Sequence, residues 1–136
     1  MSLFLQFADV CDALAATTKK LEKRALIATY LQTMDVDDAS RAALWLCGMP
    51  FPETDRRALN VGGSLLSKAI LQLSGAGGEA LSEAYRRSGD LGAAAADLLY
   101  GRAPAKASLT LAEIESALTA LAERKVHTLV VDLDPQ

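Results

Sequence analysis

The chain has 136 residues, a net charge of −3 at neutral pH, and is 51% hydrophobic but only 5% aromatic. This length suits one domain with a buried core, and the abundance of Ala and Leu favours packed helices over a sheet. The longest apolar runs fall far short of the ~20 residues that a membrane span needs, and the first residues lack the basic region of a secretory signal. We therefore expect a soluble, cytoplasmic protein with no membrane partner.

The side chains available for catalysis are few. His127 is the only histidine, which excludes a Ser-His-Asp or Cys-His arrangement and a His-rich metal site. Cys11 and Cys47 stand alone in apolar surroundings, so we expect two reduced core thiols and no metal site. The carboxylates of residues 35, 37 and 38 fall at a predicted helix start, where the dipole favours negative charge, so capping is favoured over metal binding. The chain alone is not expected to be an enzyme.

Apolar residues at helical spacing predict three helices in the first half of the chain. The predicted elements are a helix over Leu3–Ala15, a second that begins at Thr17 or Thr18 and reaches about Met34, and a third that Asp37 or Asp38 caps and that ends at Cys47 and Gly48. Trp45, the only tryptophan, is predicted to be a core residue because large aromatic side chains dominate core packing.

Four more helices are predicted in the second half. The first of these begins near Val61–Ser64, and its predicted buried stripe is Leu65, Leu66, Ala69, Ile70 and Leu73. The next two cover about Glu79–Ser88 and Leu91–Leu99. The last follows a capping box formed by Thr110 and Glu113. The sequence thus predicts an all-α fold of about seven short helices over residues 1–124, and a tail over residues 125–136 with some strand character.

The tetrapeptide Gly89-Asp90-Leu91-Gly92 marks a corner between two helices. Gly89 suits the left-handed position that closes a helix, and Asp90 can accept hydrogen bonds from the first free N–H groups of the next helix. Gly92 has no side chain and leaves room for another backbone to approach. The junction is predicted to be a corner first, with direct contact to an anion as the alternative.

Positive charge is concentrated in the middle of the chain. Residues 17–106 have a net charge of +2, whereas residues 1–16 and 107–136 have −2 and −3. The basic residues there cluster at residues 19–24, 56–57, 86–87 and 102–106. Charge alone leaves two interpretations open, solvated helix faces and a surface for an anionic partner.

Five segments occur in a familiar order: "TTKKLEKRALIATYL", "GMPFPE", "RALNVGGSLLSKAI", "YRRSGDLG" and "SLTLAEIESAL". Together they resemble the N-terminal, all-helical DNA-binding domain of ATP-dependent DNA ligases of the archaeal and eukaryotic type, over about residues 3–124. The resemblance implies a partner, duplex or nicked DNA, held across its minor groove by phosphate contacts. The adenylation motif Lys-x-Asp-Gly of such ligases does not occur in this sequence. We therefore expect no sealing activity and no cofactor in this chain, since ATP and Mg²⁺ would serve a catalytic domain.

Three helix starts carry small or hydroxyl residues that let backbone N–H groups approach a phosphate. Basic residues flank the first and the third closely, and Lys68 lies one turn further along the second helix. The candidate DNA-binding residues are Thr17, Thr18, Lys19, Lys20, Gly62, Gly63, Ser64, Lys68, Arg86, Arg87 and Gly92. The resemblance favours Thr18 with Lys20 above the others. The alternative is a helical protein-interaction or self-associating module that has lost DNA binding.

Overall fold

The computed structural model describes residues 1–55, 57–59, 61–102 and 106–123, and within them it contains seven α-helices. The only β-type pairing among these residues is an isolated bridge between Leu3 and Thr110, so the predicted all-α fold is confirmed. The described residues divide into two compact units: residues 1–55, 57–59 and 106–122 form the first, and residues 61–102 belong to the second. No helix in the described part is long and apolar enough to cross a membrane.

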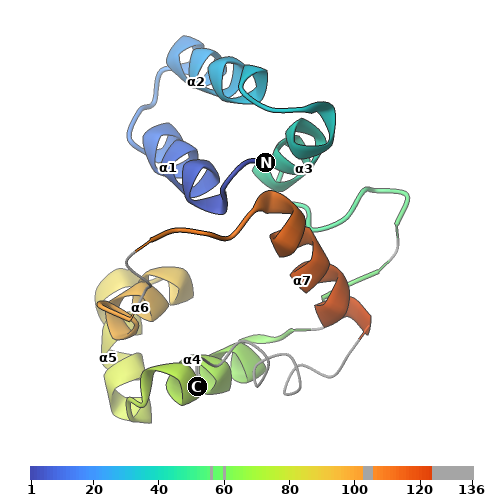
Figure 1. Cartoon of the computed structure of the whole chain (residues 1–136). Coiled ribbons are helices and arrows are strands. Elements are labelled where there is room, and N and C mark those ends of the chain that lie inside the picture. The colour runs from blue at the N-terminus through green and yellow to red at the C-terminus, as the bar shows by residue number, and fades with distance from the viewer. Residues whose placement is uncertain (56, 60, 103–105, 124–136) are drawn as a thin grey trace. The chain divides into compact units, whose positions relative to one another are not determined.

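The first unit contains α1 (Phe4–Ala15), α2 (Lys20–Gln32), α3 (Val36–Leu46) and α7 (Leu111–Glu123) (Figure 1). Its core is built on four buried residues, Phe7, Tyr30, Ala42 and Leu111, one from each helix. The Trp45 ring meets the Phe7 ring edge to face, with ring centroids 5.8 Å apart. The predicted core position of Trp45 is thus correct: it packs, partly buried, against this cluster.

The N-terminal segment ties α7 into the first unit. The backbone N–H of Phe4 donates to the carbonyl of Leu109 (2.8 Å), and the N–H of Leu111 donates to the carbonyl of Ser2 (3.0 Å). The predicted capping box is present: Thr110 Oγ1 accepts from the N–H of Glu113, and Glu113 Oε1 accepts from the N–H of Thr110. Leu111, directly after this cap, is fully buried.

A buried carboxylate also helps to hold the N-terminal segment in the first unit. Asp38 accepts hydrogen bonds from the backbone N–H of Ser2 (3.0 Å) and from Arg41 Nη1 (2.8 Å). Burial opposes ionisation of this carboxyl, but the two donors outweigh that effect and hold its pKa below the usual value. Arg41 also has its Nε 3.2 Å from Glu115 Oε1, close enough for an ion pair although not aligned as a hydrogen bond. The network therefore links the chain start, α3 and α7.

The second unit contains α4 (Gly63–Ser74), α5 (Gly78–Ser88) and α6 (Leu91–Leu98), which contact one another. Ile70, Leu81, Ala84 and Ala94 form its buried core. Both α4 and α5 end at a left-handed glycine, Gly75 (φ 72°) and Gly89 (φ 69°), and that of Gly89 was predicted. Arg102 Nη1 donates to the carbonyl of Leu73 (2.7 Å), which satisfies one of the free carbonyl groups at the end of α4.

Several local expectations need correction. The N-cap of α2 is Lys19, not a threonine, and the N-cap of α3 is Asp35, whose carboxylate accepts from the N–H of Asp38. Asp38 itself lies inside the unit because the N–H of Ser2 and the guanidinium of Arg41 reach it there. Cys47 is exposed rather than buried because it lies at the C-cap of α3.

The apolar stripe predicted for α4 is also narrower than expected. Leu65 and Leu66 are 44% and 42% exposed, because only the face centred on Ile70 packs against α5 and α6. The predicted tail over residues 125–136 lies outside the described residues.

Candidate nucleic-acid interface

The predicted DNA-binding residues fall into two groups, one in each unit. Thr17, Thr18, Lys19 and Lys20 precede or open α2 in the first unit; Gly62, Gly63, Ser64, Lys68, Arg86, Arg87 and Gly92 belong to α4, α5 and α6 in the second.

At the start of α2 an acidic side chain already meets several of the polar groups. Thr17 Oγ1 donates to Glu22 Oε2 (2.6 Å) and accepts from the N–H of Lys19 (3.2 Å). Lys19 Nζ lies 3.7 Å from Glu22 Oε1. Both members of the Lys19–Glu22 ion pair are well exposed, so the pair adds little stability. The Thr17 hydroxyl and the Lys19 ammonium group are thus both paired with Glu22.

Thr18 and Lys20 differ from these neighbours. Both are exposed, and neither has a hydrogen bond or ion pair to any residue that the structure describes. The two residues that the resemblance favoured are therefore the ones left available to an external partner.

The start of α4 is open and carries no acid. Gly62 is the N-cap with an ordinary extended conformation (φ −89°), no side chain caps the helix, and the first turn has no Asp or Glu. A Cβ atom built at Gly62 or at Gly63 would meet no other atom within 4 Å. Neither internal packing nor a positive φ at Gly62 requires glycine here, so the open backbone N–H groups can be approached from outside.

A cavity of about 630 Å³ joins the three helices of the second unit. Its lining residues are Gly63, Ser67, Leu81, Ser82, Tyr85, Arg86 and Leu91. Two predicted residues, Gly63 and Arg86, thus meet at one hollow together with the first residue of α6. No carboxylate belongs to this lining, and Arg86 has no ion-pair partner among the described residues. The hollow combines one cation and three hydroxyl groups, which suits an anion.

The two arginines at the end of α5 have different roles. Arg87 Nη2 lies 3.0 Å from Asp97 Oδ2, and Arg87 Nη1 lies 3.8 Å from Glu83 Oε1. Arg87 therefore links α5 to α6 with its charge largely neutralised. Arg86, one residue earlier, lines the cavity instead.

The glycine-aspartate corner behaves as a cap. Asp90 Oδ2 accepts from the N–H of Ala93 (2.8 Å), as predicted, so its charge points into its own helix. A Cβ at Gly92 would lie 3.2 Å from this same carboxylate oxygen, which gives an internal reason for the glycine. An approaching phosphate would meet this carboxylate, so we give Gly92 no part in the interface.

Sequence reasoning missed Ser67, Ser82 and Tyr85. The last two precede Arg86 by four residues and by one, and residues 82, 85 and 86 share one face of α5. This spacing was visible in the sequence, but the closeness of α4 was not. Lys68 and Ser64, which were predicted, are exposed on α4 but do not line the cavity.

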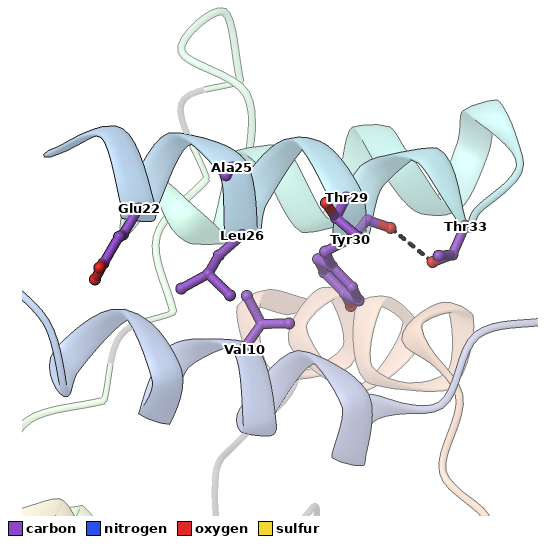
Figure 2. A pocket seen from close by; sticks show the side chains of 7 residues that line it. All are labelled: Val10, Glu22, Ala25, Leu26, Thr29, Tyr30 and Thr33. Carbon is purple, nitrogen blue, oxygen red and sulfur yellow. Dashed lines mark hydrogen bonds between the residues drawn. The ribbon is translucent and has the colours of Figure 1, made fainter. Parts of the chain in front are cut away.

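A second hollow, of about 530 Å³, lies between α1 and α2 of the first unit. Figure 2 shows the side chains of Val10 and Leu26 facing each other there, with the Tyr30 ring beside them. The Tyr30 hydroxyl is buried with no hydrogen-bond partner among the described residues. Burial, together with nearby Cys11 and Asp38, raises the pKa of Tyr30 to about 12. The lining is mainly apolar, so this hollow offers no cation to a phosphate.

Comparison with known proteins decides the family. The profile described as "DNA ligase N terminus" matches residues 3–129. This chain belongs to the DNA ligase N-terminal family. Its relatives include a probable DNA ligase from Koribacter versatilis, 44% identical over 108 residues, and one from Opitutus terrae, 38% identical over 99 residues. A DNA ligase from Archaeoglobus fulgidus is 36% identical over 98 residues.

These matches concern one part of much longer proteins. They include 79%, 73% and 71% of this chain but only 19%, 10% and 18% of the three relatives. The resemblance seen in the five sequence segments is thereby confirmed for the family. The matched region belongs to the family described as DNA ligase N terminus, and the part of it that the structure describes is helical.

Proposed function

We propose that this DNA ligase N-terminal segment binds duplex DNA through the sugar-phosphate backbone, without reading its sequence, as an accessory grip for nick sealing. The cavity at α4, α5 and α6 carries the proposal: it gathers Gly63 and Arg86 with three hydroxyl groups and has no carboxylate in its lining. Contacts of this kind position a duplex without recognising bases. A ligase that seals nicks in any sequence needs such a grip.

The start of α2 is proposed as a second contact. Thr18 and Lys20 are exposed and unpaired within the described chain. A lysine there can neutralise one phosphate and release its counterions. The family membership supports DNA as the partner of both surfaces.

We further propose that chemistry takes place outside this segment. No Lys-x-Asp-Gly sequence is present to accept AMP. ATP and Mg²⁺ would serve a catalytic region of a ligase, while this segment supplies affinity for the duplex. It would then act in DNA repair and replication through a ligase rather than alone.

A binding assay with charge-reversed variants tests the proposal. A fluorescent nicked duplex is titrated at about 50 and 200 mM salt with the natural chain and with Lys20→Glu, Arg86→Glu and Lys106→Glu. All three variants change the net charge equally, and Lys106 is an exposed residue of neither surface. We expect about tenfold weaker binding for the first two and a much smaller change for the third.

The salt dependence gives a second readout. Each lost phosphate contact should reduce the slope of log K against log salt by about 0.9. Equal effects of all three substitutions would mean that only net charge matters. A chain that dimerises with rising concentration in light scattering, yet binds no duplex at the lower salt, would instead support the protein-interaction alternative.

A further inference from the structure

The cavity of the second unit offers more hydrogen-bond donors than one phosphodiester of a DNA strand requires. Its lining includes Arg86 and the hydroxyl groups of Ser67, Ser82 and Tyr85. Within the part of the chain that the structure describes, these hydroxyl groups have no hydrogen bond and Arg86 has no ion pair. A phosphodiester presents two free oxygens and one negative charge, whereas a phosphate monoester presents three free oxygens and about two negative charges at neutral pH. The donor set therefore suits a monoester better than a strand.

Two acidic side chains that adjoin the lining residues in sequence are engaged elsewhere. Glu83 Oε1 lies 3.8 Å from Arg87 Nη1, and Asp90 Oδ2 accepts from the N–H of Ala93. The lining itself contains no carboxylate. A doubly charged anion in the cavity thus meets one guanidinium group and no acidic lining residue.

Apolar side chains form another part of the lining. Leu81 is buried, Leu91 is half-buried, and the Tyr85 side chain is 49% exposed. The volume of about 630 Å³ lies within the range of sites that hold small organic ligands, and such sites combine apolar walls with a few polar groups. The cavity therefore has room for a phosphate group together with the apolar body that carries it.

We propose that this cavity is a site for a small phosphate monoester with an apolar body, which binds there in place of a DNA phosphate and so lowers the affinity of the segment for the duplex. Arg86 donates paired hydrogen bonds to the phosphate, and the serine hydroxyls donate to the remaining oxygens. The apolar body lies against Leu91 and the Tyr85 ring. This inference rests on the proposed function and adds the regulation of the same site by a free ligand.

Amide NMR titrations of the whole chain at about pH 7.5, where a monoester is mostly doubly charged, test the site. The probes are phenyl phosphate, its diester methyl phenyl phosphate, and inorganic phosphate. Shifts of the amides of residues 67, 82 and 86 locate the bound probe. The variants are Arg86→Ala, Ser82→Ala and Arg24→Ala, and circular dichroism confirms that each retains its helices. Arg24 is the matched control because it is an exposed arginine of the first unit and does not line the cavity.

We expect phenyl phosphate to bind about tenfold more tightly than methyl phenyl phosphate, which has one fewer charge and one fewer free oxygen. It should bind about fivefold more tightly than inorganic phosphate, which lacks the apolar body. Arg86→Ala should weaken phenyl phosphate about tenfold and Ser82→Ala about threefold, whereas Arg24→Ala should leave its affinity unchanged. Phenyl phosphate should also release the fluorescent nicked duplex from the natural chain by competition.

The other outcomes separate this inference from the proposed function. Equal affinity for the monoester and its diester, or an affinity that Arg86→Ala leaves unchanged, would overturn the assignment of the cavity to a monoester. If phenyl phosphate binds as expected but the duplex does not bind at all, the ligand site stands, while the proposed function and the regulation both fail. If the duplex binds and phenyl phosphate does not, DNA binding stands and this inference is overturned. A duplex that stays bound when phenyl phosphate saturates the cavity would overturn the competition.

Discussion

Replacement of the buried carboxylate of Asp38 by an amide should destabilise the first unit strongly. Asp38 has a side chain that is only 6% exposed, and it accepts from the N–H of Ser2 and from Arg41 Nη1 at 3.0 and 2.8 Å. In Asp38→Asn the ion pair is lost, and the amide NH₂ faces at least one donor. Removal of one partner from a buried pair costs about 3 kcal/mol. For a unit of this size, that corresponds to a melting point lower by roughly 15 °C.

Asp37→Asn is the matched control, since it makes the same chemical change one residue earlier in the same helix. Asp37 is exposed and has no ion pair within the described residues, so its replacement should change stability by less than about 0.5 kcal/mol. Thermal unfolding is followed by the fluorescence of Trp45, which lies in the core of the first unit. Similar losses for the two variants would refute the structural role given to Asp38.

The pH dependence supplies a second test. The pKa of Asp38 is lowered in the folded chain from a reference value of 3.8, so the folded state binds protons less readily there than the unfolded state. The stabilisation is therefore complete above the unfolded value and is lost as the pH falls through the folded pKa. We expect the natural chain to lose stability more steeply than Asp38→Asn below about pH 4. Parallel pH profiles for the two proteins would contradict this assignment.

Three further predictions concern the helix ends. Gly89→Ala should destabilise the second unit by about 1 kcal/mol, because the residue has φ 69°. Gly78→Ala, at the first position of α5 with open space around it, should instead stabilise the unit by about 0.5 kcal/mol, and thermal melts followed by circular dichroism measure both changes. Thr110→Ala should lower the stability of the first unit by about 1 kcal/mol in a urea titration, and no loss would mean that the capping box is redundant. A double-mutant cycle on Arg87 and Asp97 should give a coupling below about 1 kcal/mol, since both side chains are over half exposed; a larger value would contradict that exposure.

The helix order and most helix ends could be predicted because they depend on neighbours in sequence. Gly89 and Asp90 form their stop and cap within four residues of chain, as do Thr110 and Glu113. The burial of Asp38 could not be predicted in this way. Its partner Ser2 is 36 residues away, and a row of acidic residues at a helix start resembles ordinary capping.

In the candidate site, too, the sequence predicted local features but not the contacts between helices. Small or hydroxyl residues marked the starts of α2 and α4, and adjacent lysines marked the start of α2. Choosing between Arg86 and Arg87 required the position of Asp97 on α6, ten residues beyond Arg87. Finding Tyr85 and Ser67 in one hollow required the packing of α4 against α5, for which the sequence contains no local signal.

The Leu3–Thr110 bridge has a consequence for how the protein is made. The ribosome delivers α1, α2 and α3 early, but α7, with its fully buried Leu111, emerges only after the whole of α4, α5 and α6. The first unit can complete its core only when that late helix arrives, whereas every helix of the second unit's three-helix core is already available by then. During synthesis the second unit should therefore fold first, and the first unit should complete its core last.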